Sequence, residues 1–119
     1  MSDAITIDLG PCGDGYRLSV TACRGSLSWA WTLGSPVIVT SRNHATLADA
    51  LANVRMYGGG AVTLEAHAMY CVDAVQRARS VAATLRAGVQ LDDALALDRA
   101  AAHLTAEGRR LARLVSEGS

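Results

Sequence analysis

Apolar and polar side chains alternate with a period of two over the first forty residues, which is the pattern of β-strands with one buried face. Three alternating segments lie at residues 5–9, 16–23 and 27–33, and the turn-forming sequences GPCGDG and RGS separate them. A fourth short strand is expected at residues 37–40, with Pro36 at its start, where proline is tolerated. The pattern predicts an antiparallel meander of three or four strands, with one apolar face and one face of small polar residues.

From residue 46 onward, the apolar positions change to spacings of three and four, which indicate amphipathic helices. A first helix is expected to end at the glycines of residues 58–60, a second to run from Thr63 to Gly88, and a third to run over residues 91–115. The last two helices carry small residues in their seams and are joined by a short link, so we expect an antiparallel hairpin. The apolar stripe of the second helix comprises Leu64, Ala68, Cys71, Val75, Ala78, Ala82 and Leu85.

Together these elements predict one α+β domain spanning residues 1–119, in which a three- to four-stranded antiparallel β-meander precedes three α-helices. The apolar face of the sheet needs a cover, and we expect the helices to provide at least part of it. Trp29 and Trp31 share the parity of Leu27 and Leu33, so we predict that both tryptophans lie in this core. The alternative, an exposed stacking platform, would leave three apolar strands facing water.

The charges of the chain are balanced, because its eleven basic residues, all of them arginines, are matched by eleven acidic residues. Zero net charge argues against a dedicated nucleic-acid binder, whose affinity comes largely from neutralising phosphates. No apolar run is long enough to span a bilayer, and residues 1–3 do not begin a signal peptide. The odd number of cysteines, three, fits a reducing compartment. We therefore expect a cytoplasmic protein that does not associate with membranes.

A metal site is the first candidate for chemistry, because His67 and Cys71 are four residues apart on a helix and their side chains are neighbours. Cys12, Cys23 and His44 could complete a tetrahedral set of ligands. The expected hairpin, however, places Cys12 in its turn and Cys23 at its far end, more than roughly 20 Å away. Cys71 also lies on an apolar stripe, where a free cysteine packs as a small hydrophobe. We therefore predict no metal, no cofactor and no disulfide.

Catalytic motifs are weak in this sequence. No G-x-S-x-G signature occurs, and the three histidines fall in separate elements. Asp92 and Asp93 diverge on a helix and suit its N-terminal turn. The glycines of residues 58–60 precede a helix but lack the lysine of a phosphate-binding loop. A non-catalytic protein is therefore the favoured interpretation, and a small enzyme is the third choice.

A modest basic strip on the third helix keeps nucleic-acid binding open. It lies away from the apolar stripe and comprises Arg99, His103, Arg110 and Arg113. Two pairs at the spacing i,i+4, Asp73 with Arg77 and His103 with Glu107, are expected on solvated outer faces.

The segment ATLADALANVR at residues 45–55 resembles the helix that follows the strands in HicB-type antitoxins. The resemblance implies a nucleic-acid-binding regulator. It covers eleven residues, and the strands around it lack the proline- and glycine-bearing motif of that family. An antitoxin-type regulator is therefore the second choice rather than the first.

Methionine and tyrosine residues gather around the glycines of residues 58–60, off the expected apolar stripes. Such side chains suit adaptable contact surfaces, and an arginine beside them could act as a charged anchor. The predicted partner-binding residues are Arg55, Met56, Tyr57, Met69 and Tyr70. Val62 lies off the stripes as well. The alternative is that both helices bury a second face where they meet.

These observations favour a non-catalytic protein-interaction module, a small regulator or inhibitor that masks the surface of a partner protein. Small phage-encoded anti-defence proteins, such as anti-CRISPR inhibitors, are of this general kind. The expected partner is a protein, a homodimer stays open, and nucleic acid is favoured less.

Overall fold

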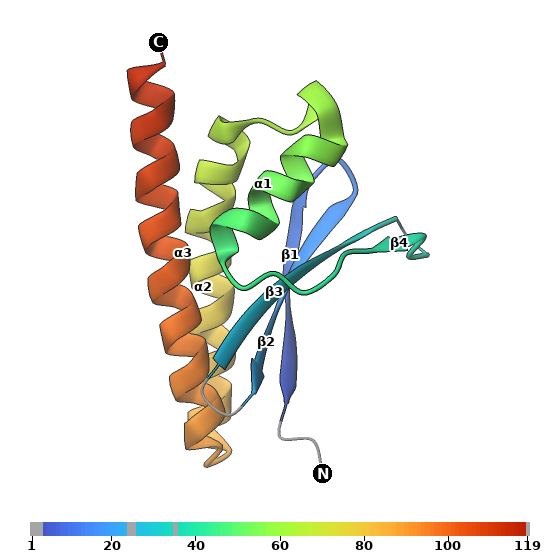
Figure 1. Ribbon diagram of the computed structural model, residues 1–119. Helices are drawn as coiled ribbons and strands as arrows, with labels where there is room; N and C mark the ends of the chain where they lie inside the picture. The colour runs from blue at the N-terminus through green and yellow to red at the C-terminus, as the bar shows by residue number, and fades with distance from the viewer. Residues whose placement is uncertain (1–3, 24–25, 35, 119) are drawn as a thin grey trace.

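The computed structural model describes residues 4–23, 26–34 and 36–118, and it has the predicted α+β architecture of a sheet followed by three helices (Figure 1). The strands are antiparallel neighbours in chain order. They are β1 (Ile5–Gly13), β2 (Tyr16–Cys23), β3 (Ser26–Leu33) and β4 (Val39–Thr40). The helices are α1 (Leu47–Gly58), α2 (Leu64–Ala87) and α3 (Leu91–Glu117), with a 3-10 turn, η1 (Gly59–Ala61), after α1. The predicted turn at residues 24–26 lies partly outside the described residues.

The β1–β2 hairpin turns at Asp14 and Gly15, later than predicted. Both residues have positive φ, 50° and 85°, which is the combination of a type I′ turn and matches the twist of the strands. A register shift at Pro11 lengthens β1 toward this turn. As a result Cys12 lies buried in β1, and its predicted position in the turn is wrong. Cys23 is exposed at the other end of the hairpin, and both are free thiols.

One face of the sheet forms the core, and the opposite face is polar, as the alternation predicts. Trp29 and Trp31 are almost fully buried, which confirms their predicted place. The sheet contributes Leu9, Cys12, Tyr16, Leu18, Val20, Trp29 and Trp31 to the core. On the polar face, the hydroxyls of Thr6 and Thr21 lie 2.8 Å apart across the strands.

The helices cover the apolar face of the sheet, with α2 against β1, α3 against β2 and α1 against β3. Figure 1 shows α2 and α3 side by side as a long hairpin, with α1 at an angle to them. The hairpin is tightly packed at Gly108, where a Cβ atom would lie 3.0 Å from the Cβ of Cys71. None of the helices in the described part of the chain is both long and apolar enough to span a membrane.

Threonine side chains cap the N-termini of α1 and α2, as predicted. Thr46 accepts a hydrogen bond from the backbone N–H of Asp49, and Thr63 accepts one from that of Ala66. α2 ends at its C-cap, Gly88, as predicted. The residue after it, Val89, takes the left-handed conformation that usually falls to glycine, with φ 62°, and its side chain is 78% exposed.

Replacing Val89 with glycine should stabilise the fold. A side chain in the left-handed region costs roughly 1–2 kcal/mol, and the greater entropy of unfolded glycine offsets part of that gain, so we expect about 0.5–1 kcal/mol and a few degrees in Tm. Thermal unfolding followed by circular dichroism would measure it. Ala83→Gly, at an exposed and right-handed position of α2, should lower Tm instead. If Val89→Gly lowered Tm as much as Ala83→Gly does, the backbone strain assigned to Val89 would be contradicted.

Candidate functional site

The five predicted partner-binding residues do not form one exposed patch. Met56, Tyr57 and Met69 are 69%, 64% and 67% exposed, as their off-stripe positions predict. Tyr70 is only 8% exposed, so its expected exposure is wrong. Arg55 is partly buried and hydrogen-bonded inside the protein. The structure therefore divides the group among two exposed surfaces, the interface of α2 with the sheet, and a hydrogen-bond chain inside the protein.

Tyr70 belongs to the interface between α2 and the sheet. Its hydroxyl donates a hydrogen bond of 3.0 Å to the backbone carbonyl of Leu9 in β1, and burial raises the pKa of Tyr70. Val62 is buried too, with its methyl groups against Gly13 and Gly58, so its expected exposure is also wrong. The alternative that these helices bury a second face holds for both residues.

A buried hydrogen-bond chain joins α1, α2 and β1 through His67. The Nε2 of His67 lies 3.0 Å from the backbone carbonyl of Cys12, and its Nδ1 lies 2.8 Å from Nη1 of Arg55. A carbonyl only accepts and a guanidinium only donates, so the ring must be neutral with its proton on Nε2. Burial, reinforced by the positive charge of Arg55, lowers the pKa of His67 to about 4. Arg55 therefore makes its hydrogen bond within the protein rather than serving as an exposed anchor for a partner.

Glu107 supplies negative charge next to this hydrogen-bond chain. The sequence predicted this residue on a solvated outer face. It is buried in α3 and accepts two hydrogen bonds of 2.7 Å from Arg110. Burial lowers the pKa of Arg55, and the charge of Glu107 opposes that shift. The expected pairing of Glu107 with His103 is wrong, because His103 lies instead beside the ring of Trp29. The signal for its burial was its place on the apolar stripe, four residues before Leu111.

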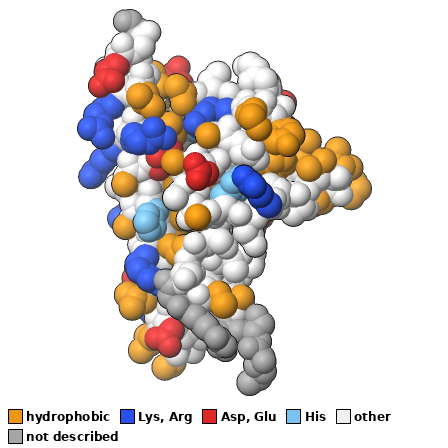
Figure 2. Space-filling view, viewed as in Figure 1, with side chains coloured by type: hydrophobic (Ala, Val, Ile, Leu, Met, Phe, Trp, Pro, Cys, Tyr) orange, Lys and Arg blue, Asp and Glu red, His pale blue; other side chains and the backbone are white. Residues whose placement is uncertain are grey.

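Exposed apolar side chains also occur around the α2–α3 turn, at Val89, Leu91 and Leu95, but two larger surfaces are the main candidates for binding. The first, here called the corner patch, comprises Met56 and Tyr57 at the end of α1, Val37 and Ile38 in the turn before β4, and Val39 in β4. Figure 2 shows hydrophobic side chains gathered over the end of α1 and along the projecting end of the β3–β4 hairpin. The sequence predicted a strand over residues 37–40, but only Val39 and Thr40 form β4, and Val37 and Ile38 lie in the turn before it.

The two parts of the corner patch meet over β3. The ring of Tyr57 lies 5.4 Å from that of Trp31, and the indole N–H of Trp31 donates to Oδ1 of Asn53 on α1 at 2.8 Å. Leu33, two residues after Trp31 and so on the same face, pairs with Val39. Val39 and Tyr57 therefore flank one row of side chains that is anchored in the core.

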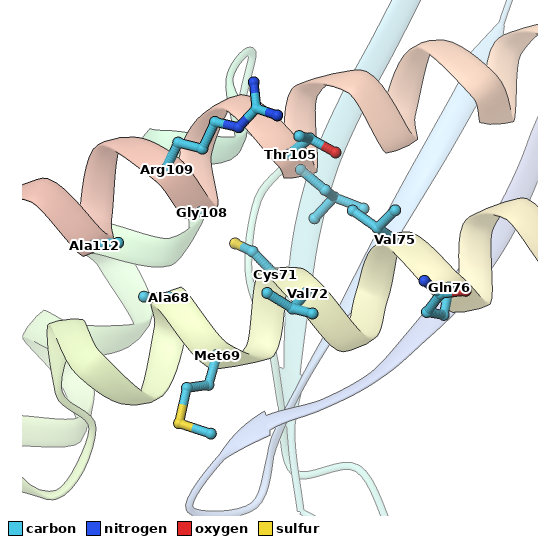
Figure 3. A pocket seen from close by; sticks show the side chains of 11 residues that line it. Ala68, Met69, Cys71, Val72, Val75, Gln76, Thr105, Gly108, Arg109 and Ala112 are labelled. Atoms are coloured by element: carbon cyan, nitrogen blue, oxygen red, sulfur yellow. The ribbon is translucent and has the colours of Figure 1, made fainter.

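The second surface, here called the outer groove, runs between α2 and α3 and has a volume of about 470 Å³. Figure 3 shows it from the side away from the sheet: Cys71 and Val75 point from α2 toward α3, and Met69 lies at the outer edge of α2. Its residues are Ala68, Met69, Cys71, Val72, Val75 and Gln76 on α2, and Leu104, Thr105, Gly108, Arg109 and Ala112 on α3. Met69 and Val72 are exposed although both are apolar.

Two of the three cysteines are buried as thiols in the core. Burial raises the pKa values of Cys12 and Cys71 to about 12, so both stay as thiols at neutral pH. Within residues 4–23, 26–34 and 36–118, no three His, Cys, Asp or Glu side chains are grouped as metal ligands. The imidazole Nε2 of His44 is buried and has no hydrogen-bond partner among the described residues.

The basic strip of α3 is interrupted by contacts within the protein. Arg110 is paired with Glu107, and His103 packs against Trp29. Arg99 and His103 line a small cavity of about 210 Å³ beside Thr46, the N-cap of α1. These contacts leave a smaller basic surface than the sequence suggested.

In comparisons with protein-family models, curated proteins and solved structures, nothing matches this chain. A function for it must therefore be inferred from its own surfaces.

The buried ring of His67 should make stability depend on pH. Its pKa is about 6.5 when unfolded and about 4 when folded, so the unfolded chain takes up the proton first as the pH falls. The free energy of unfolding should therefore fall between pH 6.5 and about 4, by up to roughly 3 kcal/mol. Asp8, whose pKa is lowered below 3.8, adds its own loss only at lower pH. Urea unfolding at a series of pH values measures the slope.

His67→Gln is the matched control for this slope. Its amide can still donate to the carbonyl of Cys12, but it does not titrate. The variant is expected to be less stable at neutral pH, with a flatter profile between about pH 6.5 and about 4. An unchanged slope in His67→Gln would show that another group is responsible.

Proposed function

We propose that the protein is a non-catalytic protein-interaction module, a small regulator or inhibitor that masks a partner protein through the corner patch. The observation that carries this proposal is the exposure of five neighbouring apolar side chains: Val37, Ile38, Val39, Met56 and Tyr57. Isolated apolar residues on a surface are ordinary, but a contiguous patch marks a contact site. Tyrosine and methionine are also enriched in protein interfaces.

The shape of the corner patch favours a partner with a concave surface. The end of the β3–β4 hairpin projects from the molecule, and its apolar residues are convex rather than part of a cavity (Figures 1 and 2). Burying one such side chain fully in a partner groove contributes roughly 1.5–3 kcal/mol. Tyr57 is already held against Trp31, so little side-chain freedom is lost on binding. A projection that fills a groove also blocks it, which is how an inhibitor acts.

Two finer points belong to the same proposal. A reducing compartment such as the cytoplasm suits an exposed free thiol at Cys23. Inhibition of a defence protein, as by anti-CRISPR proteins, is one form that masking could take. An antitoxin-type nucleic-acid regulator has less support, because Arg110 and His103 of the basic strip are engaged within the protein.

A charge placed on the corner patch should abolish binding and leave the fold intact. We expect immobilised wild-type protein to capture a defined partner from its native host, and Ile38→Asp to lose it, since a carboxylate would be buried without a counter-charge. The matched control is Leu95→Asp, which introduces the same charge at a similarly exposed residue, 61% against 73%, on α3. Quantitative mass spectrometry of the captured proteins compares the three baits.

Both variants should melt within about 2 °C of the wild type, because exposed substitutions rarely change stability by more than about 0.5 kcal/mol. Retention of the partner by Ile38→Asp, or its equal loss with Leu95→Asp, would refute the corner patch as the contact site. Partner capture that depends on added nucleic acid would favour the antitoxin-type alternative.

A further inference from the structure

We infer that the outer groove is a homodimer interface, in which α2 of one chain lies over α3 of a second copy, and the reverse. This interface is separate from the corner patch and does not depend on the proposed function. Three observations support it: the shape of the groove, the residues on the outer face of α2 and the unpaired charges around them.

The groove is large enough to accept the side chains of a helix from a second molecule. Its lining spans residues 68–76 of α2 and 104–112 of α3, about 12 Å along each helix, or somewhat over two turns. Ala68, Gly108 and Ala112 are small, so side chains from a helix lying across the groove can approach its floor closely. The floor is apolar, as Cys71, Val75 and Leu104 show.

The outer face of α2 has the residues to fill such a groove. Met69 and Val72 stand exposed there, one turn apart, and both already line the groove of their own chain. Glu65, one turn before Met69, and Asp73, one turn after it, are exposed next to them. α2 therefore presents an apolar pair flanked by acidic residues.

The exposed face of α3 has the complementary charge. Arg109 lines the groove, and Arg113 is exposed one turn further along. Figure 2 shows basic side chains gathered around the C-terminal part of α3. Within the described segments, neither arginine has an ion pair, nor does Glu65. The same holds for Asp73, whose expected pairing with Arg77 is absent there.

A twofold axis through the groove brings these surfaces together twice. Rotation about this axis exchanges the places of the two helices, so that α2 of each copy lies over α3 of the other in a four-helix arrangement. Met69 and Val72 of one chain then meet the groove of the other. Asp73 of one chain faces the arginines of α3 in the other, and the symmetry repeats each contact. A second copy is thus the one occupant whose apolar and charged residues are both visible in this structure.

The outer face of the hairpin as a whole, rather than the groove alone, sets the area that a dimer could bury. α2 has 24 residues and so is about 36 Å long, and two helices side by side are about 20 Å wide, which makes the outer face roughly 700 Å². The groove itself takes up about 12 Å of this length, or roughly 240 Å², so a dimer that buries the usual area of about 800 Å² on each partner must use the whole outer face.

Sedimentation velocity on the full chain tests the dimer directly. We expect the wild type to sediment as a dimer at micromolar concentration, and Val72→Glu to raise the dissociation constant by roughly 100-fold, because a charge would be buried at the centre of the interface. Arg109→Glu combined with Arg113→Glu should weaken the dimer by roughly 10-fold. Adding Glu65→Arg and Asp73→Arg to that double variant should restore it, since the charges are then exchanged. Leu95→Asp and Ile38→Asp should remain dimeric.

Three outcomes would overturn the inference. A wild type that stays monomeric up to about 100 μM is the first, and a dimer that survives Val72→Glu is the second, provided that circular dichroism shows the variant folded. The third is a dimer that is dissociated by Ile38→Asp, since the corner patch would then be the dimer interface. Under the first outcome, loss of partner capture with Val72→Glu would assign the groove to another protein. Partner capture that fails only with Ile38→Asp leaves the two surfaces independent.

Discussion

The attachment of α2 to the edge strand β1 is the contact on which the rest of this structure depends. β1 ends the sheet, so its outer backbone groups lack a neighbouring strand. Tyr70 and His67 donate hydrogen bonds to the carbonyls of Leu9 and Cys12, and both donors come from one face of α2. This contact covers part of the edge and sets the rotation of α2 about its own axis.

The rotation of α2 determines which of its side chains are buried and which face solvent. One side of the helix meets α3 through Cys71 and Val75, and another meets the sheet through Tyr70. The side that is left carries Met69 and Val72, which therefore face solvent despite being apolar. The neutral His67, held between Arg55 and β1, ties α1 into the same arrangement. The outer groove is thus a consequence of how the sheet is covered.

The two exposed apolar surfaces have different physical characters, and this suggests different partners. The corner patch is convex and apolar, with a tyrosine held by a buried tryptophan, which suits insertion into a groove of another protein. The outer groove is concave, with Arg109 in its lining and the acidic residues Glu65 and Asp73 exposed on α2 beside it, which suits a copy of the same surface. A dimer through the groove would leave both corner patches free, so that one assembly could engage two partner molecules.

Local patterns determined the elements, because period and capping depend only on residues close in sequence. The alternation around Trp29 and Trp31 was enough to bury both, and Thr46 and Thr63 marked two helix starts. The neighbours Met69 and Tyr70 both lie off the stripe that faces α3, and the sequence could not separate them. Only the position of β1 buried the tyrosine and left the methionine exposed. Elements that are distant in the chain decide which second face of a helix is buried. Helical periodicity depends only on nearby residues and therefore cannot predict it.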